Sequence, residues 1–184
     1  MDVNFESLDV TLGGEISLNG FWCRQAPDSP LLDVNALRAQ LRLLPILWGQ
    51  LRLKEILIDG PVCHVSREAD GSWNLAQLFG GRDDGLTERT DIPVIVIVGG
   101  RVVYSDPISF ESAVEEEITD VNVSVFAGDR EDTRFELEMR LPGAHRVEAH
   151  GRLSVVDSRL RLRVGSLNLR KLDLKAVQRF LPKE

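Results

Sequence analysis

A strict alternation of polar and apolar residues from Arg134 to Leu141 is the feature of this sequence that most limits its fold. Every second residue from Phe135 onwards is apolar, and the residues between them are arginine or glutamate. A helix would scatter these apolar side chains around its circumference, whereas a strand places all of them on one face. The segment therefore predicts a long strand with one buried face and one face in water.

The same alternation recurs in three neighbouring segments, 121–125, 147–155 and 160–164. Turn-prone stretches separate the four segments, at 127–130, 142–144 and 156–158. Short connections between long alternating runs predict a meander of antiparallel hairpins. Such a meander places the apolar residues of all four segments side by side on one face.

The first half of the chain is less regular. Residues 31–43 predict a strand whose alternation slips at Asn35-Ala36, which is typical of a β-bulge. Residues 51–58 and 62–66 predict two strands that flank a turn at Asp59-Gly60-Pro61.

Helix is expected only in short pieces. The segments that predict these pieces are Pro45–Trp48, Trp73–Phe79 and Lys175–Leu181. We expect the first piece to plug an end of the sheet. We expect the Trp73 side chain to pack in the core rather than to serve as a stacking platform for a ligand.

A polar, glycine-rich stretch at 81–91 predicts a linker between two parts of the chain. The first part is a β module at 1–80 that ends in a short helix, and the second, at 92–184, continues the sheet. Ile92–Val98 is nearly all apolar, which is typical of a strand buried on both faces. Together these segments predict a mainly β fold, an elongated and curved antiparallel sheet, open like a gutter, with two or three short helices.

No constellation of residues indicates catalysis, a bound metal or a cofactor. Cys23 and Cys63 match no metal-ligand spacing, and the sequence leaves both free thiols and a disulfide between them open. His145 and His150 are five positions apart, so a strand points them to opposite faces. The net charge of -7 argues against a dedicated nucleic-acid binder. We predict a protein that is not an enzyme, with no metal, no cofactor and no nucleic-acid partner.

The segment from 151 to 175 is rich in basic residues. They are Arg152, Arg159, Arg161, Arg163, Arg170, Lys171 and Lys175. One interpretation is a basic rim that attracts phosphate headgroups. The other, which we favour, is ordinary pairing with acidic residues across the sheet, such as Glu136 and Glu138.

The order of several punctuation motifs is informative. Gly49 begins a strand that ends at Gly60-Pro61, and a strand ending in Arg67 leads to Asp70-Gly71 and Trp73-Asn74-Leu75. After the polar stretch comes Gly-Gly-Arg-Val-Val-Tyr-Ser-Asp at 99–106. This series resembles the AsmA-like family, and the resemblance covers essentially the whole chain.

The resemblance implies a bacterial cell-envelope protein with its sheet in the periplasm. Members of this family are related to bridge-like lipid transfer proteins and form long, curved, open-sided sheets with an apolar channel. They are implicated in phospholipid transport or in outer-membrane assembly. Members usually begin with a membrane anchor, so we expect attachment to the inner membrane through flanking segments outside this chain, and other envelope proteins as further partners.

Two functions compete for the apolar stripes. The first is a lipid-accessible floor, because an acyl chain gains about 0.8 kcal/mol for each CH₂ that it buries and needs no special catalytic residue. The second is a structural or protein-binding module with a self-packed core. The residues expected to bind lipid are Val121, Val123, Val125, Phe135, Leu137, Met139, Val147, Leu153, Val155, Leu160, Leu162 and Val164.

Overall fold

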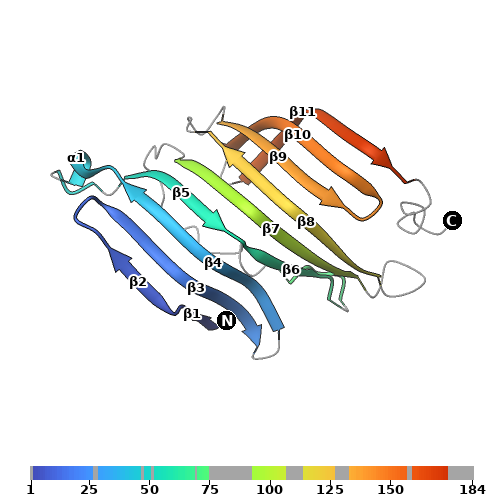
Figure 1. Cartoon of the computed structure of the whole chain (residues 1–184), viewed down its shortest axis with the longest axis horizontal. Helices are drawn as coiled ribbons and strands as arrows, with labels where there is room; N and C mark the ends of the chain where they lie inside the picture. Colours follow the sequence, from blue (N-terminus) through green and yellow to red (C-terminus); the bar gives the residue numbers. More distant parts are fainter. Residues whose placement is uncertain are drawn as a thin grey trace.

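The computed structural model describes residues 2–26, 29–46, 48–50, 52–68, 70–74, 93–106, 114–126, 133–156 and 159–173. The fold is mainly β, as predicted, and its eleven strands form one sheet (Figure 1). The elements are β1 (Asp2–Asn4), β2 (Ser7–Val10), β3 (Glu15–Ala26), β4 (Ser29–Leu41), α1 (Leu43–Ile46), β5 (Leu53–Asp59), β6 (Val62–Ser66), β7 (Val94–Asp106), β8 (Val114–Val125), β9 (Thr133–Leu141), β10 (Ala144–Val156) and β11 (Arg159–Leu172).

The second half of the chain is the predicted antiparallel meander. Strands β7, β8, β9, β10 and β11 are successive neighbours in the sheet, and every pair among them is antiparallel. Pro142 and Gly143 form the turn between β9 and β10. The strands are 9 to 14 residues long, because the alternation of polar and apolar residues continues over the whole of each segment.

The two strands predicted on either side of Asp59-Gly60-Pro61 are present, but the chain does not reverse between them. Strands β5 and β6 follow one line through the sheet, with β4 on one side and β7 on the other. Gly60 N–H donates to the Val98 carbonyl, and Arg101 N–H donates to the Pro61 carbonyl, so the ladder continues past the turn residues. Strands β5 and β6 both pair with β7 in parallel, and these are the exceptions among the described strand pairs, which are otherwise antiparallel.

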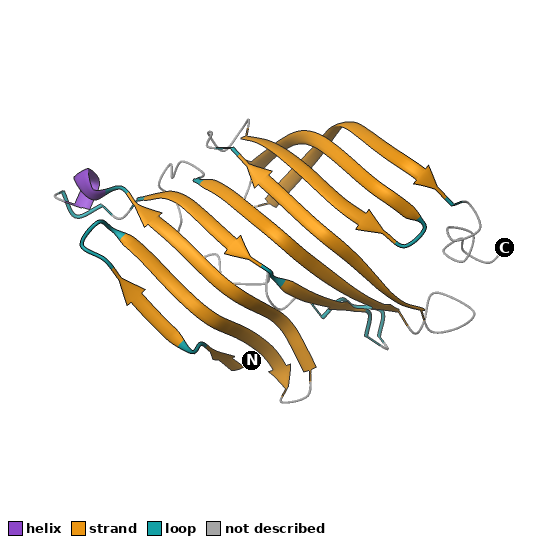
Figure 2. Cartoon of the chain, viewed as in Figure 1, coloured by secondary structure: helices purple, strands orange, loops and turns teal. Residues whose placement is uncertain are grey.

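Helix in the described residues is limited to α1, drawn in purple in Figure 2. No residue of α1 is buried, so the prediction that this segment plugs an end of the sheet is wrong. Trp73 forms an antiparallel bridge with Arg67 instead of starting a helix. The rest of the predicted helix at 75–79, the linker at 81–91 and the predicted helix at Lys175–Leu181 lie outside the described residues.

A row of residues with left-handed backbone crosses the sheet. Gly20, Gly60, Gly99 and Asp120 have φ angles of 60°, 56°, 62° and 52°. Gly20 of β3 lies opposite Asn35 of β4, and a Cβ on Gly60 would overlap the Asn35 side chain. Glycine adopts this conformation without steric cost, which explains its use on three of the strands. The alternation slip predicted at Asn35-Ala36 falls on this row.

The row keeps the apolar side chains of neighbouring strands on the same face of the sheet. Ile97 and Gly100 are three positions apart on β7, yet they pair with Val123 and Val121, which are two apart on β8. Immediately beyond, β8 carries its own extra residue at Asp120, and the register returns. Such an extra residue is a β-bulge, which turns the following side chains to the other face. Because β7 and β8 each carry one at the same level, their side chains change phase together.

Candidate functional site

Two rows of apolar residues run across nine strands on one face of the sheet, which we call the apolar face. The residues of each row pair directly from strand to strand. The first row is Leu8, Leu18, Leu37, Ile58, Ile97, Val123, Leu137, Ala149 and Leu167. The second row is Val10, Ile16, Ala39, Ile56, Ile95, Val125, Phe135, Gly151 and Val164.

The row of residues between these two belongs to the opposite face, because successive side chains on a strand alternate. It consists of Asp9, Ser17, Arg38, Leu57, Val96, Ser124, Glu136, His150 and Ser166. All of these are polar except Leu57 and Val96, so we call this the polar face. The sheet therefore separates aliphatic from polar side chains along almost its whole width.

Burial on the apolar face is greatest on β8, β9 and β10 and least on the outermost strands. Val147 is 1% exposed and Phe135 is 5% exposed, whereas Leu8 and Leu167 on the outer strands are 53% and 60% exposed. The Phe135 ring lies over Gly151, where a Cβ would collide with it, and so fills the gap that the glycine leaves in the row. The face is packed over β8 to β10, and its outermost strands present aliphatic groups to solvent.

The structure brings together ten of the twelve residues predicted to bind lipid. Val121 and Val123 lie on β8, beside Leu137 of β9, and the row continues through β10 to Leu162 and Val164 of β11. Direct pairs on this face join Val125 to Phe135, Met139 to Val147, and Leu153 to Leu162. The side chains of Val155 and Leu160 lie outside the described part of the structure.

Sequence reasoning missed the first half of this face, including Leu37, Ile58 and Ile97. Each of these residues has an apolar residue next to it in the sequence, and Ile97 lies between Val96 and Val98, so alternation does not reveal which face they occupy. The strand at Ile92–Val98 was also predicted to be buried on both faces, yet Val98 is 44% exposed.

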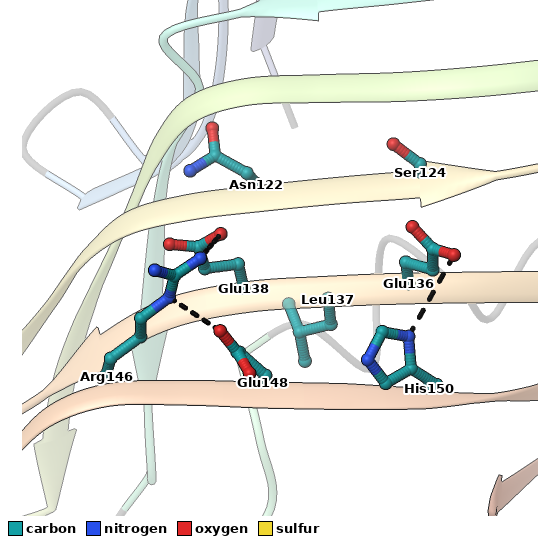
Figure 3. A pocket seen from close by; sticks show the side chains of 8 residues that line it. All are labelled: Asn122, Ser124, Glu136, Leu137, Glu138, Arg146, Glu148 and His150. Carbon is teal, nitrogen blue, oxygen red and sulfur yellow. Dashed lines mark hydrogen bonds and ion pairs between the residues drawn. The ribbon is translucent and has the colours of Figure 1, made fainter. Parts of the chain in front are cut away.

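The polar face is held by cross-strand ion pairs, several of which surround a shallow hollow (Figure 3). Arg146 contacts Glu138 at 2.7 Å and Glu148 at 2.9 Å, which relieves the repulsion between two carboxylates that lie directly opposite each other. His150 Nδ1 lies 3.9 Å from Glu136. The partners of Glu138 and Glu136 in these contacts, Arg146 and His150, lie outside the basic segment for which the pairing was predicted.

The basic segment of β11 is only partly paired in this way. Arg170 contacts Glu148 at 3.7 Å. Arg163, by contrast, lies directly opposite Arg152, which itself lies opposite Arg134 of β9. Like charges directly opposite each other on neighbouring strands destabilise the pairing of those strands. Arg134, Arg152 and Arg163 together concentrate positive charge at this corner of the polar face.

The two cysteines are free thiols. Leu32 pairs with Cys23 on one side and with Cys63 on the other, so the cysteines lie two strands apart. That is roughly 10 Å at about 4.8 Å per strand, beyond the Cα separation that a disulfide spans. Burial raises the pKa of the Cys63 thiol, which keeps it protonated and poorly nucleophilic.

The prediction that Trp73 packs in the core is wrong, because the side chain is 43% exposed. It lies against Tyr104, with ring centroids 6.1 Å apart, and under the Arg67 guanidinium at 5.9 Å. Tyr104 donates a hydrogen bond to the buried Asp106 at 3.0 Å. Burial, and then this hydrogen bond and charge, raise the pKa of Tyr104. The cluster closes the end of the β6–β7 pair.

Asn74, another residue of the motif at 70–75, has a structural role. Its side chain is buried and acts like a short piece of strand beside β6: Oδ1 accepts from Ser66 N–H at 2.9 Å, and Nδ2 donates to the His64 carbonyl at 2.8 Å. Asp70 accepts hydrogen bonds from the Ser72 amide and hydroxyl, which lowers the pKa of Asp70. These residues shape a turn and offer no reactive group.

Among the residues that the structure describes, no group of three or more His, Cys, Asp or Glu side chains is placed to hold a metal ion. Within the same ranges, no helix has the length and apolar character needed to cross a bilayer. No protein-family model and no curated protein sequence matches this chain. The extended apolar face is the candidate functional site.

Proposed function

We propose that this chain is a non-enzymatic β segment of an AsmA-like cell-envelope protein, and that its apolar face receives the acyl chains of phospholipids or other lipids. The observation that carries the proposal is the pair of apolar, mostly aliphatic rows across nine strands. We further propose that the sheet is curved into an open gutter in the periplasm, anchored to the inner membrane by flanking segments, where it serves lipid transport or outer-membrane biogenesis.

The dimensions of the rows suit an acyl chain. Nine strands at about 4.8 Å spacing give a row of roughly 40 Å, measured across the strands. The side chains along it are almost all Val, Leu, Ile or Ala, so the floor offers dispersion contacts and no polar group that a hydrocarbon would have to desolvate. A chain lying along a row meets the same chemistry on each strand and can slide from one strand to the next.

A second candidate is a structural or protein-binding module whose apolar face is closed on itself. The near-complete burial of Val147 on β10 favours it. The exposure of 59% at Leu162 and 49% at Val164 favours the lipid-accessible floor. The two candidates differ in what occupies the outer strands, which makes β11 the place to test them.

The test uses a photo-crosslinking amino acid at position 162 on the apolar face, with position 166 on the polar face of the same strand as the control. The proposal expects lipid adducts from 162 and far fewer from 166, and co-purified lipid in native mass spectra. Leu162→Asp should abolish the bound lipid while the circular dichroism spectrum is unchanged, because the side chain is already exposed. A folded protein without lipid adducts at either position would count decisively against the proposal.

A further inference from the structure

Five bulky apolar side chains project from one end of the sheet, and we call them the apolar tip. Leu12, Leu44 and Trp48 are 102%, 70% and 72% exposed, and Leu43 and Ile46 are 48% and 42% exposed. They come from two turns, the β2–β3 turn and the α1 segment, which lie at the same end of the sheet (Figure 2). An apolar group of this size in full contact with water marks an interaction site.

The apolar tip is a built element, because backbone and side-chain contacts join its two turns. Leu41 N–H donates to the Gly14 carbonyl at 2.8 Å, and the Gln40 side chain donates to the Gly13 carbonyl at 2.9 Å. The Leu43 side chain lies against Gly14, where a Cβ would come within 2.6 Å of it. The turn after α1 is closed by Gly49 N–H, which donates to the Ile46 carbonyl at 2.9 Å.

The charges on the segment that carries α1 and leads into β5 are all positive from 41 to 54. From 41 to 54 the chain contains Arg42, Arg52 and Lys54 and no Asp or Glu, although the chain as a whole has a net charge of -7. All three side chains are exposed, and none forms an ion pair with another described residue. Arg42 and Arg52 are neighbours, joined by a 2.8 Å backbone hydrogen bond. The nearest carboxylates, Glu15 and Glu55, lie one step back, opposite Gln40.

We propose that the apolar tip inserts into the surface of an anionic lipid bilayer, with Arg42, Arg52 and Lys54 resting on its phosphate groups. Leucine side chains suit the acyl boundary, and tryptophan prefers the level of the headgroups because its ring is apolar and its N–H is polar. Lysine and arginine just behind such a group add attraction to anionic lipids. A protein partner would require a complementary pocket for each projecting side chain, whereas a bilayer accepts them without a fixed geometry.

Insertion of the apolar tip into a bilayer deepens the proposed function. The role of the tip rests on that function, because the tip would bring a lipid-binding face to its source of lipid. Ala39 of the second apolar row, Leu41 and Leu43 follow one another at every second position, so apolar side chains lead from the apolar face to the tip. A tip seated in a bilayer would place the start of the apolar face next to the acyl region from which lipid is taken or to which it is delivered.

The experiment measures co-flotation of the full chain with vesicles of phosphatidylcholine alone and of phosphatidylcholine mixed with phosphatidylglycerol. Wild type should bind the anionic vesicles and bind the neutral ones weakly. The double variant Leu44→Ser with Trp48→Ser should lower the partition coefficient about tenfold or more, because two large side chains no longer enter the bilayer. The matched control is Trp73→Ser, which removes another exposed tryptophan outside the tip and should bind like wild type.

The charges are tested by Arg42→Gln, Arg52→Gln and Lys54→Gln in one chain, which should erase the preference for anionic vesicles. With Trp22 and Trp73 changed to Phe, the fluorescence of Trp48 should shift to the blue on anionic vesicles. Unchanged flotation of the tip variant, no spectral shift, or protection of the tip by dimer formation without vesicle binding would each overturn the inference.

The same samples separate this inference from the proposed function. Lipid on the apolar face is read from native mass spectra and crosslinking at 162, and vesicle binding is read from flotation. A tip variant that carries lipid but does not float supports both ideas. Wild type that floats but carries no lipid contradicts the proposed function alone, and wild type that carries lipid but does not float contradicts the tip alone.

Discussion

The two faces of the sheet are built on the same backbone but are stabilised by different interactions. On the apolar face, neighbouring strands contribute aliphatic groups that bury one another, and at Val147 only 1% of the residue surface is left exposed. On the polar face, the ion pairs around Arg146 join side chains that are largely in water, with exposures of 44% for Arg146 and 45% for Glu138. Exposed pairs contribute little to stability, so the buried part of the apolar face on β8 to β10 should dominate the free energy of unfolding.

The largest expected effect follows from a charge in that buried part. Val147→Asp places an ionised group among aliphatic side chains, which costs several kcal/mol and should unfold the chain or lower its urea midpoint severely. His145→Asp is the control, because His145 is exposed on the same strand and the change should stay within about 1 kcal/mol. Similar urea midpoints for the two variants would break the contrast between buried and exposed positions.

The left-handed row that keeps the faces in phase is tested by Gly60→Ala. The change forces a Cβ into the Asn35 side chain and into a positive φ, so it should cost about 2–3 kcal/mol or more in chemical denaturation. Gly49→Ala is the matched control, because Gly49 has φ of 72° with open space around it. Only the backbone cost of roughly 1 kcal/mol remains there. Equal losses at the two sites would show that the crowding at Gly60 has no energetic weight.

A smaller effect is expected on the polar face. Arg146→Gln removes two ion pairs and leaves Glu138 directly opposite Glu148, which should cost about 0.5–1 kcal/mol at low salt and less at high salt. Adding Glu138→Gln should restore most of the loss, since the like-charged pair is then gone. A salt-independent loss above about 2 kcal/mol would mean that this network behaves as a buried one.

The smallest effect concerns pH. The Ser72 hydrogen bonds lower the pKa of Asp70 in the folded chain, so the ionised carboxylate contributes stability above its unfolded pKa, and this is lost as pH falls through the folded value. Asp70 is fully exposed, so unfolding curves should barely register the change. An NMR titration of the Asp70 carboxyl should show the lowered pKa, and Ser72→Ala should raise it towards the ordinary value.

The sequence predicted the second half of the sheet better than the first, for a physical reason. From β8 to β11 the chain turns back at once to its previous neighbour, so local alternation around Leu137 contains almost all the information needed. In β5 and β6 the outcome depends on pairing with β7, which follows only after a long stretch of chain. An Asp-Gly-Pro sequence is compatible both with a reversal and with a bulge, and only the neighbours on both sides select the bulge.

The candidate site, too, was predicted better in the second half of the chain than in the first. Ten residues of the apolar face were predicted from alternation alone, whereas Leu37 and Ile58 were not, because Ala36 and Leu57 beside them are also apolar and hide the alternation. Trp73 was assigned to a core by its apolar character, but its ring lies beneath an arginine and beside Tyr104. The exposure of the apolar tip was also unpredictable, because an apolar run looks the same in sequence whether it is covered or projects into solvent.

The row of left-handed residues also makes the lengths of neighbouring strands interdependent. Deleting Gly99 alone would exchange the faces of β7 beyond that point, turning Arg101 towards the apolar face and Val102 away from it, while β6 and β8 stayed as they are. Arg101 would then carry a charge into the aliphatic groups of the neighbouring strands. Insertions and deletions at this level of the sheet are therefore tolerated only if they occur on adjacent strands together, so these strands should change length as a group over evolution.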